Sequence, residues 1–129
     1  MSSPRFEFHQ DHLAIRLEGV QRVEAMRRAL VVPYATIENA EVGAPGWPGI
    51  TTVRVGTHLP QIIACGTFHD NAQWKFVDIR RATKQALTLH LKDHAEFDEV
   101  TLDVPDPGQI LDEVARHARI APPIPHVLE

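Results

Sequence analysis

Apolar and polar residues alternate along most of this chain, which is the pattern of β-strands with two unlike faces. The clearest strand is 86–92, where Leu87, Leu89 and Leu91 alternate with polar neighbours. The same period of two predicts strands or extended segments at 6–8, 13–17, 31–34, 34–42, 51–55, 61–68, 73–80 and 100–104. The first two are expected to form a hairpin, and 34–42 is expected to be one strand with a bulge or bend.

Turn-forming residues divide these strands. The hairpin is expected to turn around 10–12, and another turn is expected at 70–71. The stretch 43–49 is rich in glycine and proline and must be a loop, while 56–60 is expected to separate two strands.

Two segments change to the helical period of about 3.6 residues. Apolar residues at 20, 23, 26 and 30, with good helix formers between them, predict a short amphipathic helix near 19–30. A second helix is predicted near 107–118, where Asp106 can cap the free backbone N–H groups and Pro107 suits the first helical position. Gln109 stands where a capping box requires it.

This order of elements predicts a single domain over residues 1–129 of the mainly β (β+α) class. The expected architecture is a small barrel or sandwich with the C-terminal helix as a plug, which serves as a binding scaffold more often than as an enzyme. A proline-rich tail is expected at about 119–129, and its segment 121–125 is expected to lie as polyproline on the surface.

Composition narrows the range of partners. The net charge is −4 and the sequence pI is near 6.0, so no nucleic-acid partner and no general contact with a membrane surface are expected. Apolar runs fall far short of the ~20 residues that span a bilayer. The single cysteine fits a reducing compartment. The first five residues contain no hydrophobic signal region, so a cytoplasmic location is expected.

Several structural motifs together resemble the bacterial pleckstrin-homology-like (PH-like) domain family, in particular its small actinobacterial-type members. These are Val32-Pro33 followed by Ile37, the loop at 43–49, Gly66-Thr67-Phe68 ahead of an aromatic strand, and Val104-Pro105-Asp106-Pro107. The resemblance covers about 5–118, and most such proteins have no assigned activity. It implies a strongly bent antiparallel β-barrel or sandwich with one open end plugged by the C-terminal helix.

The eight histidines raise the possibility of a metal site. His9 and His12 are three residues apart, and His90 and His94 flank a strand end. A zinc site requires about four ligands at characteristic spacings, and neither pair has cysteine partners. We therefore expect no metal and no cofactor, and we keep a metal protein or enzyme that uses the histidines as an alternative.

A thiol nucleophile is the other chemistry to consider. Cys65 and His69 share a parity on one predicted strand, but they lie roughly 13 Å apart along it, too far for a hydrogen bond. A free cysteine in an apolar run is usually a packing residue. No catalytic residue is therefore predicted, and the loop at 43–49 lacks the ending of a phosphate-binding loop.

The predicted binding residues are four arginines and one tryptophan. Arg16, Arg22, Arg27 and Arg28 form a basic group that could hold a small anionic ligand or a lipid headgroup, although acidic residues interleave with it. Trp47, between glycine and proline, either folds back over one end of the core or is exposed as a contact anchor, and the first interpretation is favoured.

These observations favour a non-enzymatic interaction module that binds a protein partner or itself. Open sheet edges are the expected route to a homo-oligomer, because they readily accept another strand. The alternatives are the anion binder that uses the arginines and the metal protein or enzyme.

Overall fold

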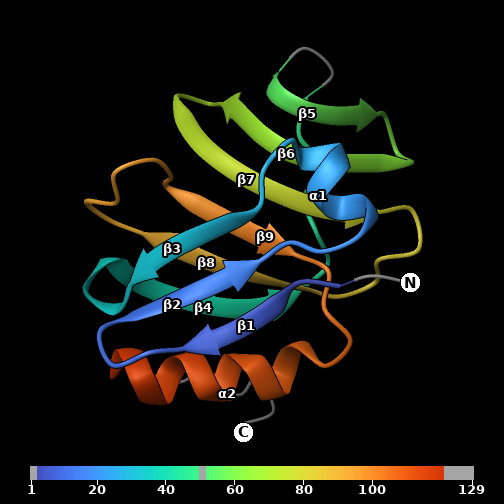
Figure 1. The fold of residues 1–129 in the computed structure, drawn as a ribbon. Helices are drawn as coiled ribbons and strands as arrows, with labels where there is room; N and C mark the ends of the chain where they lie inside the picture. Colours follow the sequence, from blue (N-terminus) through green and yellow to red (C-terminus); the bar gives the residue numbers. More distant parts are fainter. Residues whose placement is uncertain (1–2, 50–51, 121–129) are drawn as a thin grey trace, which may run out of the picture.

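Two β-sheets and a C-terminal helix form the body of the protein (Figure 1). The computed structural model describes residues 3–49 and 52–120. The first sheet has the order β1-β2-β3, with β1 Arg5–Phe8, β2 His12–Arg16 and β3 Ala29–Pro33. The second has the order β4-β8-β9-β7-β6-β5, with β4 Ile37–Gly43, β5 Val53–Leu59, β6 Ile63–Asp70, β7 Gln73–Arg80, β8 Ala86–Leu91 and β9 Glu99–Leu102. The helices are α1 Val20–Ala25, the 3₁₀ turn η1 Tyr34–Thr36 and α2 Pro107–Ala118.

The N-terminal hairpin is confirmed. β1 pairs antiparallel with β2, and Phe6 stands opposite Ile15. The backbone N–H of His9 donates to the carbonyl oxygen of His12 at 3.0 Å and closes the turn. The apolar parity noted in the sequence therefore directs one face of this sheet to the core.

The chain passes from the first sheet to the second at η1. Pro33 ends β3, and the Tyr34 hydroxyl donates to the carbonyl oxygen of His9 at 2.7 Å, which fixes the corner to the first hairpin. β4 then starts with a shift of register between Ile37 and Asn39. This shift is the bulge that the sequence predicted.

The second sheet differs from a purely antiparallel wall in one place. β5, β6 and β7 form a meander in which each strand pairs with the next, but β8 pairs with β4 and not with β7. β9 forms a hairpin with β8 and lies between β8 and β7, where it runs parallel to β7. The expected antiparallel arrangement is therefore wrong for this one pair, because β7 and β8 run in opposite directions and a strand between them that is antiparallel to β8 must be parallel to β7.

The fold is mainly β with a C-terminal helix, as predicted. Over the described ranges, the strands do not close into a barrel: β1 and β3 are the edges of one sheet, and β4 and β5 are the edges of the other. The coarse fold class is confirmed, and the finer PH-like arrangement remains an expectation.

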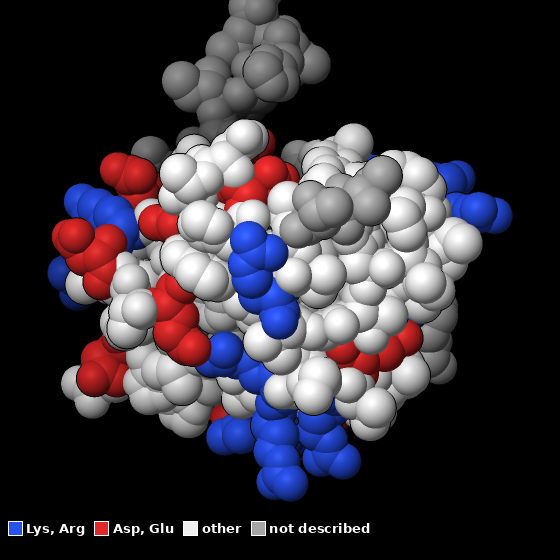
Figure 2. All heavy atoms as spheres, turned by 90° about the horizontal axis from the view of Figure 1, so that it is seen from above, with Lys and Arg blue, Asp and Glu red and all other residues white. Residues whose placement is uncertain are grey.

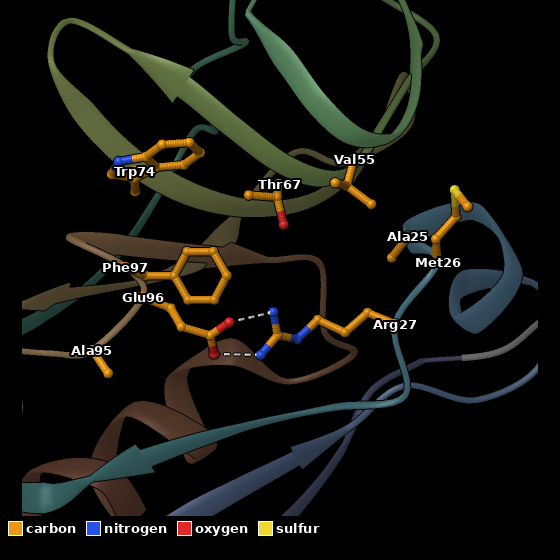
Figure 3. Close-up of a pocket in the computed structure, with 9 residues that line it drawn as sticks. All are labelled: Ala25, Met26, Arg27, Val55, Thr67, Trp74, Ala95, Glu96 and Phe97. Carbon is orange, nitrogen blue, oxygen red and sulfur yellow. Dashed lines mark hydrogen bonds and ion pairs between the residues drawn. The ribbon is translucent and has the colours of Figure 1, made fainter.

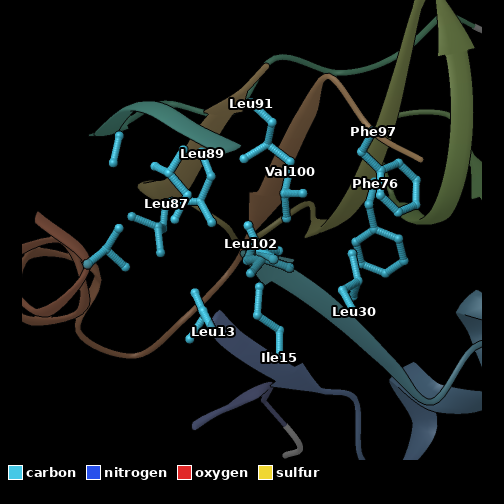
Figure 4. Close-up of a cluster of buried hydrophobic side chains, with 14 of the residues drawn as sticks. Leu13, Ile15, Leu30, Phe76, Leu87, Leu89, Leu91, Phe97, Val100 and Leu102 are labelled. Atoms are coloured by element: carbon cyan, nitrogen blue, oxygen red, sulfur yellow. The ribbon is translucent and has the colours of Figure 1, made fainter. Parts of the chain in front are cut away.

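The main core lies between the two sheets and α2. Leu13, Ile15 and Leu30 of the first sheet face side chains of β7, β8 and β9 (Figure 4). These opposing side chains are fully or almost fully buried: Phe76, Leu87, Leu89, Val100 and Leu102. α2 contributes Val114, which is also fully buried, and so covers one side of this core.

α2 begins as the sequence predicted. Asp106 Oδ1 accepts a hydrogen bond from the Gln109 backbone N–H at 3.3 Å, and Pro107 occupies the first turn. The His117 ring stacks on Phe8 with centroids 4.7 Å apart, which ties the end of α2 to β1. The predicted polyproline at 121–125 lies outside the described residues.

A second, smaller core lies on the opposite face of β6 and β7. It consists of Ala64, Phe68, Val77, Ile79 and Ala86, and Trp47 and Val53 pack against it. The loop after β4 thus folds over this face and brings the Trp47 ring onto it. The interpretation of Trp47 as folded back is confirmed by this packing.

Two predicted boundaries are wrong. The helix near 19–30 is only Val20–Ala25, because Met26 takes a left-handed conformation (φ 55°, ψ 41°) and β3 begins at Ala29. The segment 56–60 does not separate two strands, since β5 continues through Gly56 to Leu59. Pairing with β6 decides both the length and the end of β5.

Candidate functional site

The two valine side chains of α1 and the adjacent Met26 are exposed to solvent. Val20, Val23 and Met26 are 51%, 72% and 73% exposed, whereas Gln21 and Ala25 are buried. The helix is amphipathic, as predicted, and the structure shows that these three apolar side chains face away from the core. An outward apolar stripe of this kind is typical of a contact surface.

A hollow of about 440 Å³ lies beside α1 (Figure 3). We call it the α1 groove; it is lined by Ala25, Met26, Arg27, Val55, Thr67, Trp74, Ala95, Glu96 and Phe97. Val55 and Thr67 are cross-strand partners, so they share one face of the sheet. Its volume is within the range of about 300–1,000 Å³ that is usual for binding pockets.

An ion pair fixes one wall of the α1 groove. The Arg27 guanidinium donates two hydrogen bonds to Glu96, at 3.0 and 2.5 Å, and its Nε donates to the carbonyl oxygen of Ala29 at 2.8 Å. It also lies over the Phe97 ring at 5.2 Å from the centroid. Hydrogen bonding to Arg27 holds the pKa of Glu96 below its usual value. Arg27 therefore holds the 93–97 segment against β3.

His94 secures the same segment. Its Nδ1 lies 3.0 Å from the backbone nitrogen of Glu96 and 3.1 Å from that of Phe97, and its Nε2 lies 2.8 Å from the carbonyl oxygen of Val31. A neutral ring with the proton on Nε2 satisfies all three contacts, because Nδ1 then accepts and Nε2 donates. His94 thus has a structural role in the wall of the α1 groove.

These contacts also close the free edge of β3. Its carbonyl oxygens at Ala29, Val31 and Pro33 accept hydrogen bonds from the side chains of Arg27, His94 and Thr36. The three residues alternate along the strand, so their carbonyls point away from β2. A strand added to this edge would have to displace these donors.

Three of the four predicted arginines meet at a second hollow of about 400 Å³. We call it the arginine hollow; it is lined by Arg5, Arg16, Leu17, Glu18, Gly19, Arg22 and Arg28. The structure adds Arg5 to the predicted group and places Arg27 at the α1 groove instead. The sequence did not indicate Arg5, because only the pairing of β1 with β2 brings it opposite Arg16.

Carboxylates neutralise part of this charge. Arg16 Nε lies 2.9 Å from Glu7, and Arg5 lies 3.4 Å from Glu18. Within residues 3–49 and 52–120, no ion pair or hydrogen bond of the Arg22 or Arg28 side chains is found. Figure 2 shows basic and acidic groups interspersed over one face of the molecule, with several Lys or Arg side chains gathered at its lower edge.

The sequence did not indicate a buried polar cluster beneath α1, which we call the polar seat. It consists of Gln21, Glu24, Cys65, Asp78 and Arg80. Asp78 is 1% exposed and stands opposite Cys65 across β6 and β7. The signal available in the sequence was an acidic residue in a strand whose other interior positions are apolar.

Cys65 belongs to this seat and is fully buried. Burial raises the pKa of its thiol far above the usual value, which makes a thiolate nucleophile unfavourable. His69 lies elsewhere on β6, with its ring 4.5 Å from the ring of Trp74. The structure does not bring the cysteine and the histidine together.

Two of the other histidines each contact a carboxylate. His12 Nδ1 lies 2.7 Å from Asp11, and His90 Nε2 lies 2.5 Å from Glu41. The rings of His9 and His12 stack with centroids 4.6 Å apart. Among the residues that the structure describes, no group of three or more His, Cys, Asp or Glu side chains could hold a metal ion.

Comparisons with protein-family models, with curated proteins and with solved structures found no match to this chain. No helix in the described part of the chain is long and apolar enough to cross a membrane. The interpretation of function therefore depends on the α1 groove, the arginine hollow and the polar seat.

Proposed function

We propose that this protein is a non-enzymatic interaction module that associates with a second copy of itself through α1 and the α1 groove. Kinship with bacterial PH-like domains is part of this proposal. It is supported by the mainly β body and by α2, which packs over one side of the main core.

The observation that carries the proposal is the position of an apolar projection beside an apolar hollow. α1 turns Val23 and Met26 to solvent, and the α1 groove next to it is lined by Val55, Trp74 and Phe97. Under a two-fold axis, each α1 enters the groove of the other copy, so both projections are buried by one self-complementary contact. Interfaces of standard size bury about 1,600 Å² in total, so both the helix and the groove must take part.

The charges of the groove are compatible with this contact. Arg27 and Glu96 are the two charged residues among its lining, and they neutralise each other. A second copy therefore meets no unpaired charge there. Burial of apolar side chains provides the favourable free energy of association.

The hydrogen bonds along the free edge of β3 also favour association through the α1 groove. The β3 carbonyls already accept hydrogen bonds from Arg27, His94 and Thr36. Strand addition at β3 would break these bonds, whereas packing of α1 into the groove would leave them intact. At β3, we therefore favour side-chain packing over the open-edge route expected from the sequence.

Size-exclusion chromatography with light scattering over a concentration series tests the proposal. The protein should move from monomer mass to dimer mass, and Val23→Glu or Trp74→Ser should weaken dimerisation at least about tenfold, which corresponds to 1.4 kcal/mol. Gln109→Glu adds the same charge as Val23→Glu at an exposed position of α2 and should leave the dimer unchanged. A monomer at all concentrations, or equal weakening by Gln109→Glu, would contradict self-association.

The arginine hollow favours a second candidate function, the binding of an anion of the phosphate class. Four arginines line it against one lining carboxylate, Glu18, and Arg22 and Arg28 have side chains available for a ligand. A guanidinium group binds phosphate oxygens in a bidentate manner. The local charge is thus positive although the whole protein is acidic.

Calorimetric titration with pyrophosphate and flotation with phosphatidylserine vesicles distinguish a free phosphate from a lipid headgroup. The double change Arg22→Gln with Arg28→Gln should abolish whichever binding occurs, and Arg81→Gln, at another exposed arginine, should not. Absence of binding to both probes, or equal loss with Arg81→Gln, would remove this candidate.

A further inference from the structure

We propose that Asp78 is a proton-operated switch that sets how firmly α1 is held on the second sheet. The proposal starts from an unusual buried group. Asp78 is 1% exposed, and neither of its carboxylate oxygens has a hydrogen-bond partner among the described residues. The neighbouring Cys65 thiol is directed to the carbonyl oxygen of Gln21, at 3.7 Å.

An ionised carboxylate without partners is costly in a protein interior, so such a group either stays protonated or acquires a partner. Burial raises the pKa of Asp78 to about 6. The groups that face it are Arg80, which lowers this pKa, Glu24 and Asp103, which raise it, and the Cys65 thiol. Asp78 is therefore uncharged below about pH 6 and charged above it.

α1 is held on the sheet mainly by polar contacts. The Glu24 carboxylate pairs with the Arg80 guanidinium, and the Glu24 carbonyl oxygen accepts a hydrogen bond from the Thr57 hydroxyl at 3.0 Å. Ala25 is the apolar side chain of α1 that is buried against the core. Because the apolar contact is small, the hold on α1 depends strongly on the pair between Glu24 and Arg80.

Asp78 is placed to compete with Glu24 for the Arg80 guanidinium. Asp78 and Arg80 are two residues apart on β7, so their side chains leave the same face of the strand. With Asp78 protonated, Arg80 pairs with Glu24 and holds α1. With Asp78 ionised, the nearest cation that can neutralise it is Arg80, and a guanidinium drawn to Asp78 releases Glu24 and with it α1.

The switch has a consequence for the surface described above. α1 carries Val23 and Met26 and forms part of the α1 groove, so proton uptake by Asp78 would order that groove. This consequence rests on the proposed self-association, but the switch itself does not. Its test therefore uses the hold on α1 as the readout and does not require an association partner.

Backbone amide exchange measured by NMR at pH 5 and pH 8, corrected for the intrinsic pH dependence of exchange, tests the switch. The Met26 and Arg27 amides donate to the carbonyls of Val23 and Arg22, so they report on the end of α1. Their protection should fall between pH 5 and pH 8 by up to about 100-fold, since each pKa unit corresponds to a factor of ten. The amides of α2 should not change.

Asp78→Asn keeps the shape of the side chain without its titration, and it should remove the pH dependence of α1 protection. Asp103→Asn is the matched control, because Asp103 also lies near the seat but accepts a hydrogen bond from the Thr83 hydroxyl at 2.9 Å. It should keep the drop in α1 protection between pH 5 and pH 8, with the midpoint moved to lower pH because the Asp103 charge no longer raises the pKa of Asp78. The proposal is wrong if wild-type protection is the same at both pH values, or if the drop persists in Asp78→Asn.

A second measurement covers the case in which Asp78→Asn does not fold. Carboxyl carbon NMR of the wild-type protein should give a titration midpoint near 6 for Asp78, and the chemical shifts of the Met26 and Arg27 amides should follow the same midpoint. An Asp78 midpoint below about 4.5, in the ordinary range of an exposed carboxyl group, would overturn the switch, and so would amide shifts that do not follow the midpoint.

Discussion

Gly56 and Gly66 stand directly opposite each other in the pairing of β5 with β6, and neither position has room for a side chain. A Cβ on Gly56 would lie 2.3 Å from the carbonyl oxygen of Cys65, and one on Gly66 would lie 2.2 Å from that of Val55. Both glycines also have positive φ angles, 134° and 147°, which other residues rarely adopt. The close approach of the two strands therefore requires glycine on both sides.

We predict that Gly56→Ala or Gly66→Ala lowers the free energy of unfolding by about 3 kcal/mol or more, because backbone strain and steric overlap combine. Urea denaturation followed by circular dichroism measures the change. Gly43→Ala, at a position with no heavy atom within 4 Å of the added Cβ, is the control and should change stability far less. Equal effects at positions 43 and 56 would contradict the steric explanation.

Two substitutions at the start of α2 should change the free energy of unfolding in opposite directions. Asp106→Ala removes the side-chain cap on the Gln109 N–H and should lower the free energy of unfolding by about 1 kcal/mol. Gly108→Ala, in the first turn of the same helix and with open space around the added Cβ, should raise it by about 0.5–1 kcal/mol. Thermal unfolding of both variants checks the two signs. A stabilised Asp106→Ala protein would show that the cap contributes nothing.

Local signals in the sequence were enough for most of the fold. Alternation located the strands of both sheets, and Asp106 and Pro107 located the start of α2. These signals are reliable because they arise from the chain itself: the pleat of a strand, the free N–H groups of a helix end and the fixed φ of proline. The mainly β class with a terminal helix followed from them.

The features of the fold that the sequence could not predict depend on which strands pair with each other. The parallel pairing of β7 with β9 results from the position of β8 beside β4, and no local pattern encodes that position. β5 continues through Gly56 because Gly66 lies opposite, although an isolated glycine in a sequence suggests a break.

The candidate sites show the same limit. Periodicity gives the face on which apolar side chains of α1 lie, but not whether that face points inward, and here it points outward. Arg27 and Arg28 are adjacent in the chain, yet they line different hollows, because Met26 ends α1 in a left-handed conformation just before them. A helix continuing to residue 30 would have kept them together on one element.

Arg27 offers a test of how the 93–97 segment is held. Arg27→Lys keeps the charge but loses the two-bond pairing with Glu96 and the Nε bond to Ala29, so we predict a loss of about 1 kcal/mol in unfolding free energy. Arg116→Lys is the control, because Arg116 pairs with Glu113 on the exposed side of α2 and should change stability by less than about 0.5 kcal/mol. Chemical denaturation at low and moderate salt compares the two. Equal losses would mean that Arg27 acts only as a surface charge.

The raised pKa of Asp78 predicts a specific pH dependence of global stability. The folded protein holds the Asp78 proton up to about pH 6, whereas the unfolded chain releases it near 3.8, the ordinary pKa of an aspartate. The folded state therefore binds more protons between these values, and its free energy of unfolding falls as the pH rises through this window. The two pKa values limit the loss to about 3 kcal/mol, because one unit corresponds to 1.36 kcal/mol.

Urea denaturation of the wild-type protein and of Asp78→Asn at several pH values between 4 and 7.5 measures this dependence. As the pH rises, Asp78→Asn should become more stable relative to the wild-type protein. This difference in unfolding free energy should level off above about pH 7. Glu7, Asp11 and Glu96 have lowered pKa values and act in the opposite sense at lower pH, but both proteins contain them, so their effects cancel in the difference. A difference that does not change with pH would mean that Asp78 titrates alike in the folded and unfolded chains, and that the buried carboxylate has a partner after all.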